Sequence, residues 1–139
     1  MSNFIKSYQA NVGLNHTPAY QVSGQPFASG SINANGGTAV RIQFPYVTRW
    51  VQVINHTTTE LTCSFSEAGL TGNNHFKIHG VHSGGSKEGG YPQVYELKVS
   101  EMWFTGSADF DVVAGLTSIP ASRTTTDDGP SWSGSAGVG

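Results

Sequence analysis

The sequence predicts an all-β fold: a single antiparallel β-sandwich or jelly-roll-like domain with flexible N- and C-terminal arms. Three observations lead to this prediction. Apolar and polar residues alternate in several short runs, which is the period of a strand with one buried face. Glycine and proline separate these runs, and 18 of the 139 residues are glycine. No window has the period of an amphipathic helix, and the length suits one hydrophobic core.

The first half of the chain contains four of the expected strands. Their approximate ranges are 20–27, 38–44, 48–55 and 60–66. Glycines precede the second run and Pro45 follows it, so both of its ends carry residues that favour turns. Within the last three runs the apolar residues share one parity, which predicts that they point inward together: Val40, Ile42, Phe44, Val51, Val53, Leu61, Cys63 and Phe65.

The second half contains three further expected strands, over 74–80, 93–104 and 109–114. Breaks again separate them, because Gly69 and Gly72 precede the first and the glycine-rich loop 82–90 follows it. The expected inward positions are Phe76, Ile78, Tyr95, Leu97, Val99, Trp103 and Phe110. Across both halves we expect the core to be formed chiefly by Phe44, Val53, Phe65, Phe76, Leu97, Val99 and Phe110.

The two ends of the chain differ from this middle. Residues 1–19 are polar and lack a sustained period, and residues 121–139 are rich in Gly, Ser and Thr. Such segments bury little apolar surface, so we expect both to be arms that flank a β-sandwich domain over residues 20–120.

Composition narrows the possible partners and locations. Charged residues are 12% of the chain, its net charge is −2, and its seven Lys and Arg residues are scattered, so we expect no nucleic-acid partner. No apolar run approaches the ~20 residues of a membrane helix, and we expect no membrane partner. Residues 1–10 lack the basic start and apolar run of a secretory signal. The single Cys63 is expected to be a buried apolar residue in a reducing compartment.

Three neighbouring histidines are candidates for metal binding. His75, His79 and His82 fall within eight residues, but in a strand His75 and His79 would stand ~13 Å apart, too far to share one ion. We therefore expect no metal site and no cofactor within one chain. A site shared between subunits would escape this argument.

Catalytic motifs are also missing from the sequence. It has no G-x-S-x-G nucleophile elbow and no phosphate-binding glycine loop. Glu96 and Glu101 have opposite parity and belong to opposite faces of one expected strand, whereas Asp109 and Asp111 flank the inward Phe110 and are expected on its solvent face. We expect no catalytic residues and no enzymatic activity. A small β-fold enzyme, such as a glycosidase or a cupin-like oxygenase, stays open as an alternative.

Four aromatic residues are the candidates for assembly contacts: Trp50, Trp103, Trp132 and Tyr91. Trp50 and Trp103 lie on expected strands, where a large ring acts as a core or interface anchor. Trp132 lies in the Gly/Ser-rich C-terminal arm, where an aromatic ring gains little unless it docks onto another surface.

Several segments resemble small virion structural proteins of tailed bacteriophages. They are YQVSGQPF at 20–27, FPYVTRWVQVIN at 44–55, FSEAGL at 65–70, ELKVSEMWFTG at 96–106, VVAGLTSI at 112–119 and WSGSAGVG at 132–139. The resemblance covers most of the chain from Tyr20 and carries no catalytic signature. It implies a β-rich subunit that decorates or cements a capsid, or that forms a vertex or tail part.

The residues and the resemblance together predict a non-enzymatic capsid decoration or cement subunit, or a vertex subunit. Its expected partners are the major capsid protein and copies of itself, and its expected location is the virion, assembled in the host cytoplasm. Whether the homo-oligomer is a trimer or a pentamer stays open. The alternative is a receptor- or glycan-binding β-sandwich module of a tail or head fibre, in which Trp50, Trp103 or Tyr91 would stack on sugar rings of a cell-surface glycan.

Overall fold

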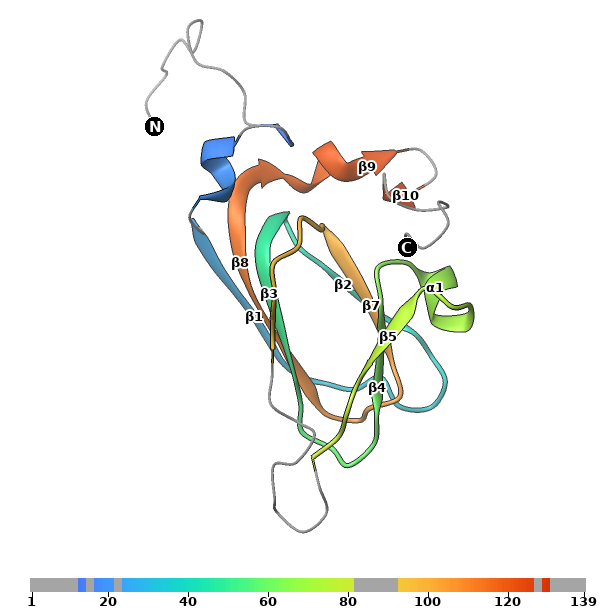
Figure 1. Ribbon diagram of the computed structural model, residues 1–139. Coiled ribbons are helices and arrows are strands. Elements are labelled where there is room, and N and C mark those ends of the chain that lie inside the picture. The colour runs from blue at the N-terminus through green and yellow to red at the C-terminus, as the bar shows by residue number, and fades with distance from the viewer. Residues whose placement is uncertain (1–12, 15–16, 22–23, 82–92, 127–128, 131–139) are drawn as a thin grey trace, which may run out of the picture.

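A computed structural model of the chain describes residues 13–14, 17–21, 24–81, 93–126 and 129–130. Nearly half of these residues form two antiparallel sheets of four strands that lie face to face (Figure 1). Among the described residues no helix is long and apolar enough to cross a membrane. The predicted all-β sandwich is therefore confirmed.

Eight strands build the two sheets. We call the sheet with the order β1-β8-β3-β6 sheet A, and the sheet with the order β2-β7-β4-β5 sheet B. Their bounds are β1 Gln25–Ile32, β2 Val40–Gln43, β3 Tyr46–Asn55, β4 Leu61–Ser64, β5 His75–Ile78, β6 Val94–Tyr95, β7 Glu101–Thr105 and β8 Phe110–Pro120.

The strand order is that of a jelly roll. Strand β1 pairs with β8, β2 with β7, β3 with β6, and β4 with β5, all antiparallel. These are the pairings of one long hairpin that has been rolled up so that its strands divide between two sheets. Of the two architectures that the sequence predicts, the topology is thus the jelly roll.

The core lies between the sheets and is formed by the inward-pointing residues of the strands in both sheets. Phe44, Val53, Val99 and Phe110 are buried, as predicted. The predicted core residues Phe65, Phe76 and Leu97 are only partly buried and pack around this centre. Leu61, which was expected to point inward, is fully buried, and residues that the sequence did not single out complete the core: Met102, Phe104, Val112 and Leu116.

The expected strand over 93–104 is interrupted, and its predicted register is wrong at the end. Strand β6 belongs to sheet A and β7 to sheet B, so the chain crosses between sheets over residues 96–100. The Oγ1 of Thr48 donates to Leu97 O at 2.6 Å and accepts from Val99 N at 3.1 Å, which holds the crossing segment against β3. The crossing reverses the parity: Val99 points inward, but Met102 and Phe104 follow it rather than Trp103.

Two other boundaries differ from the prediction. The first strand begins at Gln25, because Thr17–Tyr20 form a 3-10 turn, η1, closed by a bond from Gln21 N to Pro18 O. The last strand continues to Pro120 instead of ending near 114.

A short helix, α1, spans Glu67–Thr71, where only glycine breaks were expected. Its N-cap is Ser66, whose side chain accepts from Gly69 N, and five residues are too few to leave a helical period in the sequence.

The packed structure extends into the predicted C-terminal arm. A 3-10 turn, η2, spans Ala121–Thr124, and the buried Thr124 hydroxyl is hydrogen-bonded to Ser100 Oγ. The short strands β9, Thr125–Thr126, and β10, Gly129–Pro130, pair with each other. The predicted candidates Tyr91 and Trp132 lie outside the described residues.

Candidate functional site

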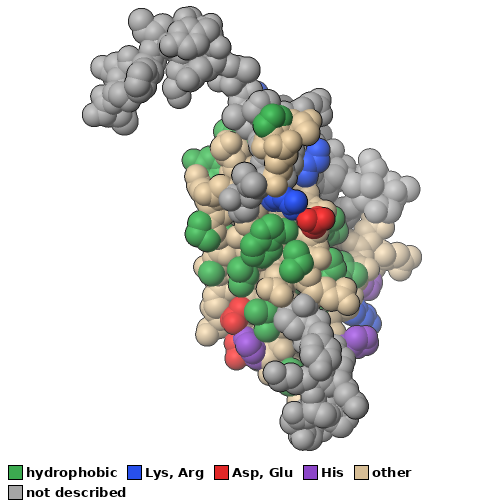
Figure 2. All heavy atoms as spheres, turned by 60° about the vertical axis from the view of Figure 1, so that its left-hand side comes forward, with side chains coloured by type: hydrophobic (Ala, Val, Ile, Leu, Met, Phe, Trp, Pro, Cys, Tyr) green, Lys and Arg blue, Asp and Glu red, His purple; other side chains and the backbone are tan. Residues whose placement is uncertain are grey.

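The outer face of sheet A carries an apolar surface. Residues directly opposite each other in antiparallel strands share a face, and the register aligns Ala28, Val113, Gln52 and Val94 in one row across all four strands. The apolar outward residues of this sheet, which we call the apolar face, are Pro26, Ala28, Trp50, Ile54, Val94 and Val113. Figure 2 shows apolar side chains gathered in the middle of this side of the molecule.

Two residues anchor the apolar face. Trp50 lies directly opposite Gly115 of β8, which has no side chain, so the indole has room above the neighbouring strand. Gly115 is nevertheless buried, as expected for a backbone position beside a large ring. Val94 on the edge strand β6 is 55% exposed and is the one large apolar residue in the exposed class within the described ranges. Most solvent-facing sheet positions are polar, so this surface is unusual.

Charged residues lie at the two ends of the apolar face. At one end Arg49 Nη1 and Glu96 Oε1 are 2.7 Å apart, and Lys98 follows on the same outward parity as Val94 and Glu96. At the other end His56 Nε2 and Asp111 Oδ2 are 2.7 Å apart, with exposed Asp109 nearby. Figure 2 shows blue and red side chains above the apolar ones, and red and purple side chains below them.

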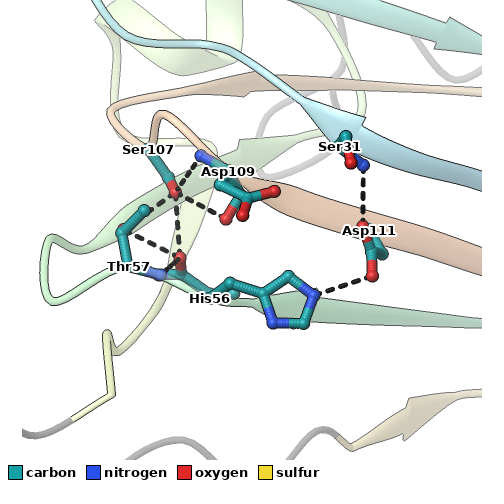
Figure 3. A network of polar contacts seen from close by, with 7 residues as sticks. Ser31, His56, Thr57, Ser107, Asp109 and Asp111 are labelled. Atoms are coloured by element: carbon teal, nitrogen blue, oxygen red, sulfur yellow. Dashed lines mark hydrogen bonds and ion pairs between the residues drawn. The ribbon is translucent and has the colours of Figure 1, made fainter.

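The His56–Asp111 pair also fastens the edge strand β1 (Figure 3). The other carboxylate oxygen of Asp111 accepts from Ser31 N at 2.8 Å, within the irregularity that interrupts the β1–β8 register. Ser31 has a φ of 54°, a strained value for a residue with a side chain, and this bond helps to hold it. The hydrogen bond between the side chains raises the pKa of His56 and lowers the pKa of Asp111. The pair is an electrostatic clamp between β3, β8 and β1.

The neighbouring hydroxyl and amide groups in Figure 3 form a separate buried network. The Asn55 Oδ1 accepts from Thr57 N at 3.1 Å and from Ser107 Oγ at 2.9 Å, while Asn55 Nδ2 donates to Thr59 O at 2.7 Å. The amide of Asn55 is thus used on both sides to join the turn after β3 to the turn before β8. Asn55 therefore has a structural role, because the polar atoms of its side chain are hydrogen-bonded to backbone and hydroxyl groups of the two turns.

Trp103 lies on the opposite side of the molecule, on the outer face of sheet B. Its Nε1 donates to Glu101 Oε2 at 3.0 Å, and the Arg41 Nε donates to the same oxygen at 2.6 Å. The guanidinium of Arg41 also lies 5.6 Å from the centre of the indole ring. The prediction that Trp103 points inward is wrong. Its indole belongs to a polar cluster of three side chains.

The other candidates from the sequence do not converge on a site. His75 lies on the outward side of β5, where its Nδ1 is 3.2 Å from Gly69 O, and His79 follows the end of β5, where its Nδ1 is 3.4 Å from Glu60 Oε2. Within the described ranges no group of three or more His, Cys, Asp or Glu residues could hold a metal ion, and His82 lies outside them. Cys63 is fully buried, as predicted, and burial raises the pKa of its thiol.

Of the two aromatic candidates that the structure describes, Trp50 lies in the apolar face and Trp103 does not. Sequence reasoning missed Ile54, Val94 and Val113. The outward parity shared by Trp50, Gln52 and Ile54 in the expected strand 48–55 could have indicated Ile54. The other two could not be found in this way, because their place beside Trp50 depends on which strands are neighbours.

No family model, curated protein or solved structure matches the chain. Its function is therefore inferred from its own residues and geometry.

Proposed function

We propose that the chain is a non-enzymatic virion structural protein, a capsid decoration, cement or vertex subunit that binds and stabilises the head of a tailed phage. The observation that carries this proposal is the apolar face of sheet A. Trp50, Ile54, Val94 and Val113 belong to three different strands and lie on one outward face, which they share with the polar Gln52. A contiguous outward apolar surface on a small domain marks a site of protein association.

Two further features support a role in assembly. The jelly-roll order is used by viral capsid domains, although lectins and cupins use it as well, so the fold favours the proposal without deciding it. The polar clusters of the described residues each have a structural use: His56 and Asp111 clamp β1, and Glu101 orients Arg41 and Trp103. A subunit that acts through its surface needs no reactive group.

The geometry favours assembly over glycan stacking. Sugar-binding aromatic rings lie beside polar groups that hydrogen-bond the hydroxyls. Trp103 has polar neighbours, but Arg41 already lies over its ring and Glu101 accepts from its Nε1. Trp50 lies opposite Gly115 of β8, and among its neighbours on the face Glu96 is already paired with Arg49.

The proposal is tested on purified particles. Quantitative mass spectrometry of virions should find the chain in a fixed ratio to the shell protein, and particles that lack it should rupture at a lower temperature. Finding the chain only in the soluble fraction of infected cells would contradict the proposal.

A matched pair of variants locates the contact. Val113→Glu places a charge in the apolar face, whereas Thr105→Glu places the same charge on the outer face of sheet B. Both residues are half-buried and outward, and each lies on the second strand of its sheet. We expect Val113→Glu to abolish particle binding and Thr105→Glu to preserve it, with thermal unfolding used to verify that both variants fold. Equal binding by the two variants would exclude the apolar face as the contact.

A further inference from the structure

We propose that Asn35 is a site of spontaneous covalent modification, at which the backbone nitrogen of Gly36 attacks the side-chain carbon Cγ and the asparagine becomes aspartate or isoaspartate. Water is the co-reactant. The site lies in the loop of residues 33–39 between β1 and β2, and the inference does not depend on the proposed function. It follows from a contrast between the two asparagines of this loop, Asn33 and Asn35.

The reacting groups of Asn35 already lie together. Gly36 N donates to Asn35 Oδ1 at 2.9 Å, and this oxygen is bonded to Cγ, so the nitrogen lies next to the carbon that it would attack. Their union closes a five-membered ring, and groups that are held in contact react far faster than the same groups in a flexible chain. Asn35 and Gly36 are both exposed, so water can reach the ring once it has formed.

Gly36 places no side chain beside the attacking nitrogen. Its φ is 95°, a backbone conformation that favours glycine. Apart from the adjacent residues of the chain, no heavy atom of the described residues lies within 4 Å of the point where a Cβ of Gly36 would stand. The same open space surrounds Gly37, whose φ is 81°. The loop therefore leaves room for the ring and for the changed backbone of the product.

Asn33 is also exposed, but its hydrogen bonds oppose the same reaction. Its Oδ1 accepts from Asn35 N at 2.9 Å, so its side chain is engaged with the nitrogen two residues along the chain and not with the next one. The next nitrogen belongs to Ala34 and donates to Ser107 O at 2.8 Å. Ala34 is buried, and its carbonyl oxygen accepts from Gly106 N at 2.9 Å. We therefore expect Asn33 to keep its amide while Asn35 loses it.

The reaction has two steps and needs no oxidant or reductant. Gly36 N gives up its proton to the solvent and bonds to Cγ, and the side-chain amide of Asn35 takes up a proton and leaves as ammonia, which yields a succinimide ring. Water then opens the ring. Cleavage of the bond between Gly36 N and Cγ gives aspartate, and cleavage of the bond to the α-carbonyl carbon gives isoaspartate. Either product adds one negative charge to a chain whose net charge is −2.

Peptide mapping by mass spectrometry of the folded full chain, incubated at neutral pH, tests the inference. We expect a time-dependent loss of the Asn35 amide that yields both aspartate and isoaspartate, with Asn33 as the internal control that stays intact. Isoaspartate is the deciding product, because it forms only if the Gly36 nitrogen has bonded to Cγ. An Asn35 that keeps its amide, or that yields aspartate alone, would contradict the inference.

Comparison with the chain unfolded in guanidinium chloride shows what the fold contributes. A fold that holds the nitrogen out of reach of Cγ would slow the reaction by about 100-fold, because small misplacements of reacting atoms are that costly. Since the two atoms lie together in this loop, Asn35 should react in the folded chain within about tenfold of its rate in the unfolded chain. A larger slowing by the fold would overturn the inference.

Two glycine substitutions separate the nucleophile from the loop around it. Gly36→Ala and Gly37→Ala each place a Cβ at a positive φ and in open space, so they strain the backbone alike. Gly36→Ala also puts that Cβ beside the attacking nitrogen, so it should slow the loss of the amide by about tenfold, whereas Gly37→Ala should leave the rate nearly unchanged. Thermal unfolding verifies that both variants fold. Asn35→Gln keeps both glycines and should retain its amide, because its longer side chain would have to close a six-membered ring. Equal rates in the two glycine variants, or rapid loss of the amide from Asn35→Gln, would exclude Gly36 N as the nucleophile.

Discussion

The outer faces of the two sheets have the same architecture and opposite surface chemistry. Each belongs to a four-stranded antiparallel sheet, and among the described residues each has one tryptophan and one Arg–Glu ion pair. On sheet B the tryptophan and the ion pair form one cluster, in which Glu101 binds both Arg41 and the indole of Trp103. On sheet A the ion pair joins Arg49 to Glu96 at the end of the face, and Trp50 lies opposite Gly115 on the same face as Val113.

The two faces differ in whether their tryptophan has polar partners within its own chain. The indole of Trp103 already has a carboxylate and a guanidinium of its own chain as partners, so it does not need contacts from another molecule. Trp50 shares its face with Val113 and Ile54 and with the exposed Val94 at the edge, and this leaves apolar surface that a partner can bury. We therefore expect substitutions on the outer face of sheet B to change stability, and substitutions on the apolar face to change association.

The largest expected effect lies in the core that both sheets share. Phe104 of β7 is fully buried, and its ring centre is 4.9 Å from that of Phe110 on β8. Phe104→Ala should lower the free energy of unfolding by about 3 to 5 kcal/mol, because it removes a large apolar side chain and leaves a cavity between the sheets. Urea denaturation measures this loss.

Phe65→Ala serves as the control for that prediction. Phe65 is only partly buried, follows the end of β4 and lies at the edge of the core, with its ring centre 5.9 Å from that of Phe76. Its truncation should cost clearly less than that of Phe104. Equal losses would mean that the core extends further toward α1 than the burial of these residues indicates.

The second effect compares the two Arg–Glu pairs directly. The Glu101 side chain is 6% exposed and the Glu96 side chain is 69% exposed, although their hydrogen bonds to arginine are of similar length, 2.6 and 2.7 Å. Glu101→Ala should cost about 1.5 to 3 kcal/mol, since it leaves the Trp103 indole and Arg41 without their shared acceptor. Glu96→Ala should cost about 0 to 1 kcal/mol, as for an exposed pair.

Denaturation of both variants under the same conditions checks this comparison. If the two substitutions cost the same, the polar cluster of sheet B adds no more stability than a surface ion pair, and the proposed division between the two faces fails.

Much of the fold could be predicted because its signal is local. Alternation along 38–44 and 48–55 needs no knowledge of the partner strands, and the buried Phe44 and Val53 follow from it. The reversal between Val99 and Met102 could not be predicted in this way. It depends on the chain leaving sheet A for sheet B, where Thr48, about fifty residues away, binds the crossing backbone.

Only part of the candidate site could be predicted from such local patterns. Trp50 was identified as an anchor from its residue type, and Ile54 shares its parity. The association of Trp50 with Val113 and Val94 results from the pairing of β3 with β8 and β6, and pairing between distant strands leaves no pattern within either strand. The same limit explains Trp103: its outward orientation depends on a register that the sheet crossing shifts.

The third effect is a pH dependence at the end of the apolar face that holds His56 and Asp111. The pKa of His56 is raised above its ordinary 6.5, so the stability that the pair contributes is complete below pH 6.5 and is lost as the pH rises through the folded-state pKa. The pKa of Asp111 is lowered below its ordinary 3.8, so the contribution is also lost as the pH falls through that lower value. The clamp should therefore be strongest between about pH 3.8 and 6.5.

Comparison of the wild-type chain with His56→Gln isolates this contribution. Both side chains are partly exposed, so the difference in unfolding free energy should be no more than about 1 kcal/mol near pH 5 and should shrink by pH 9. Urea denaturation of both chains at the two pH values measures it. A difference that grows with pH would mean that His56 acts in its neutral form, as a hydrogen-bonding group only.

The smallest expected effect on stability comes from the exposed large apolar residue of the described ranges, Val94. Val94 is 55% exposed on the edge strand β6, so Val94→Ser removes few packing contacts and should change the free energy of unfolding by no more than about 0.5 kcal/mol. The same substitution removes apolar area from the proposed contact surface, so it should weaken binding to the particle while the melting temperature stays nearly constant. Calorimetry of the free chain and a particle-binding assay separate the two quantities. A loss of stability above 1 kcal/mol would show that Val94 packs within its own chain, and the apolar face would then be part of the domain's own packing, as the polar cluster is on sheet B.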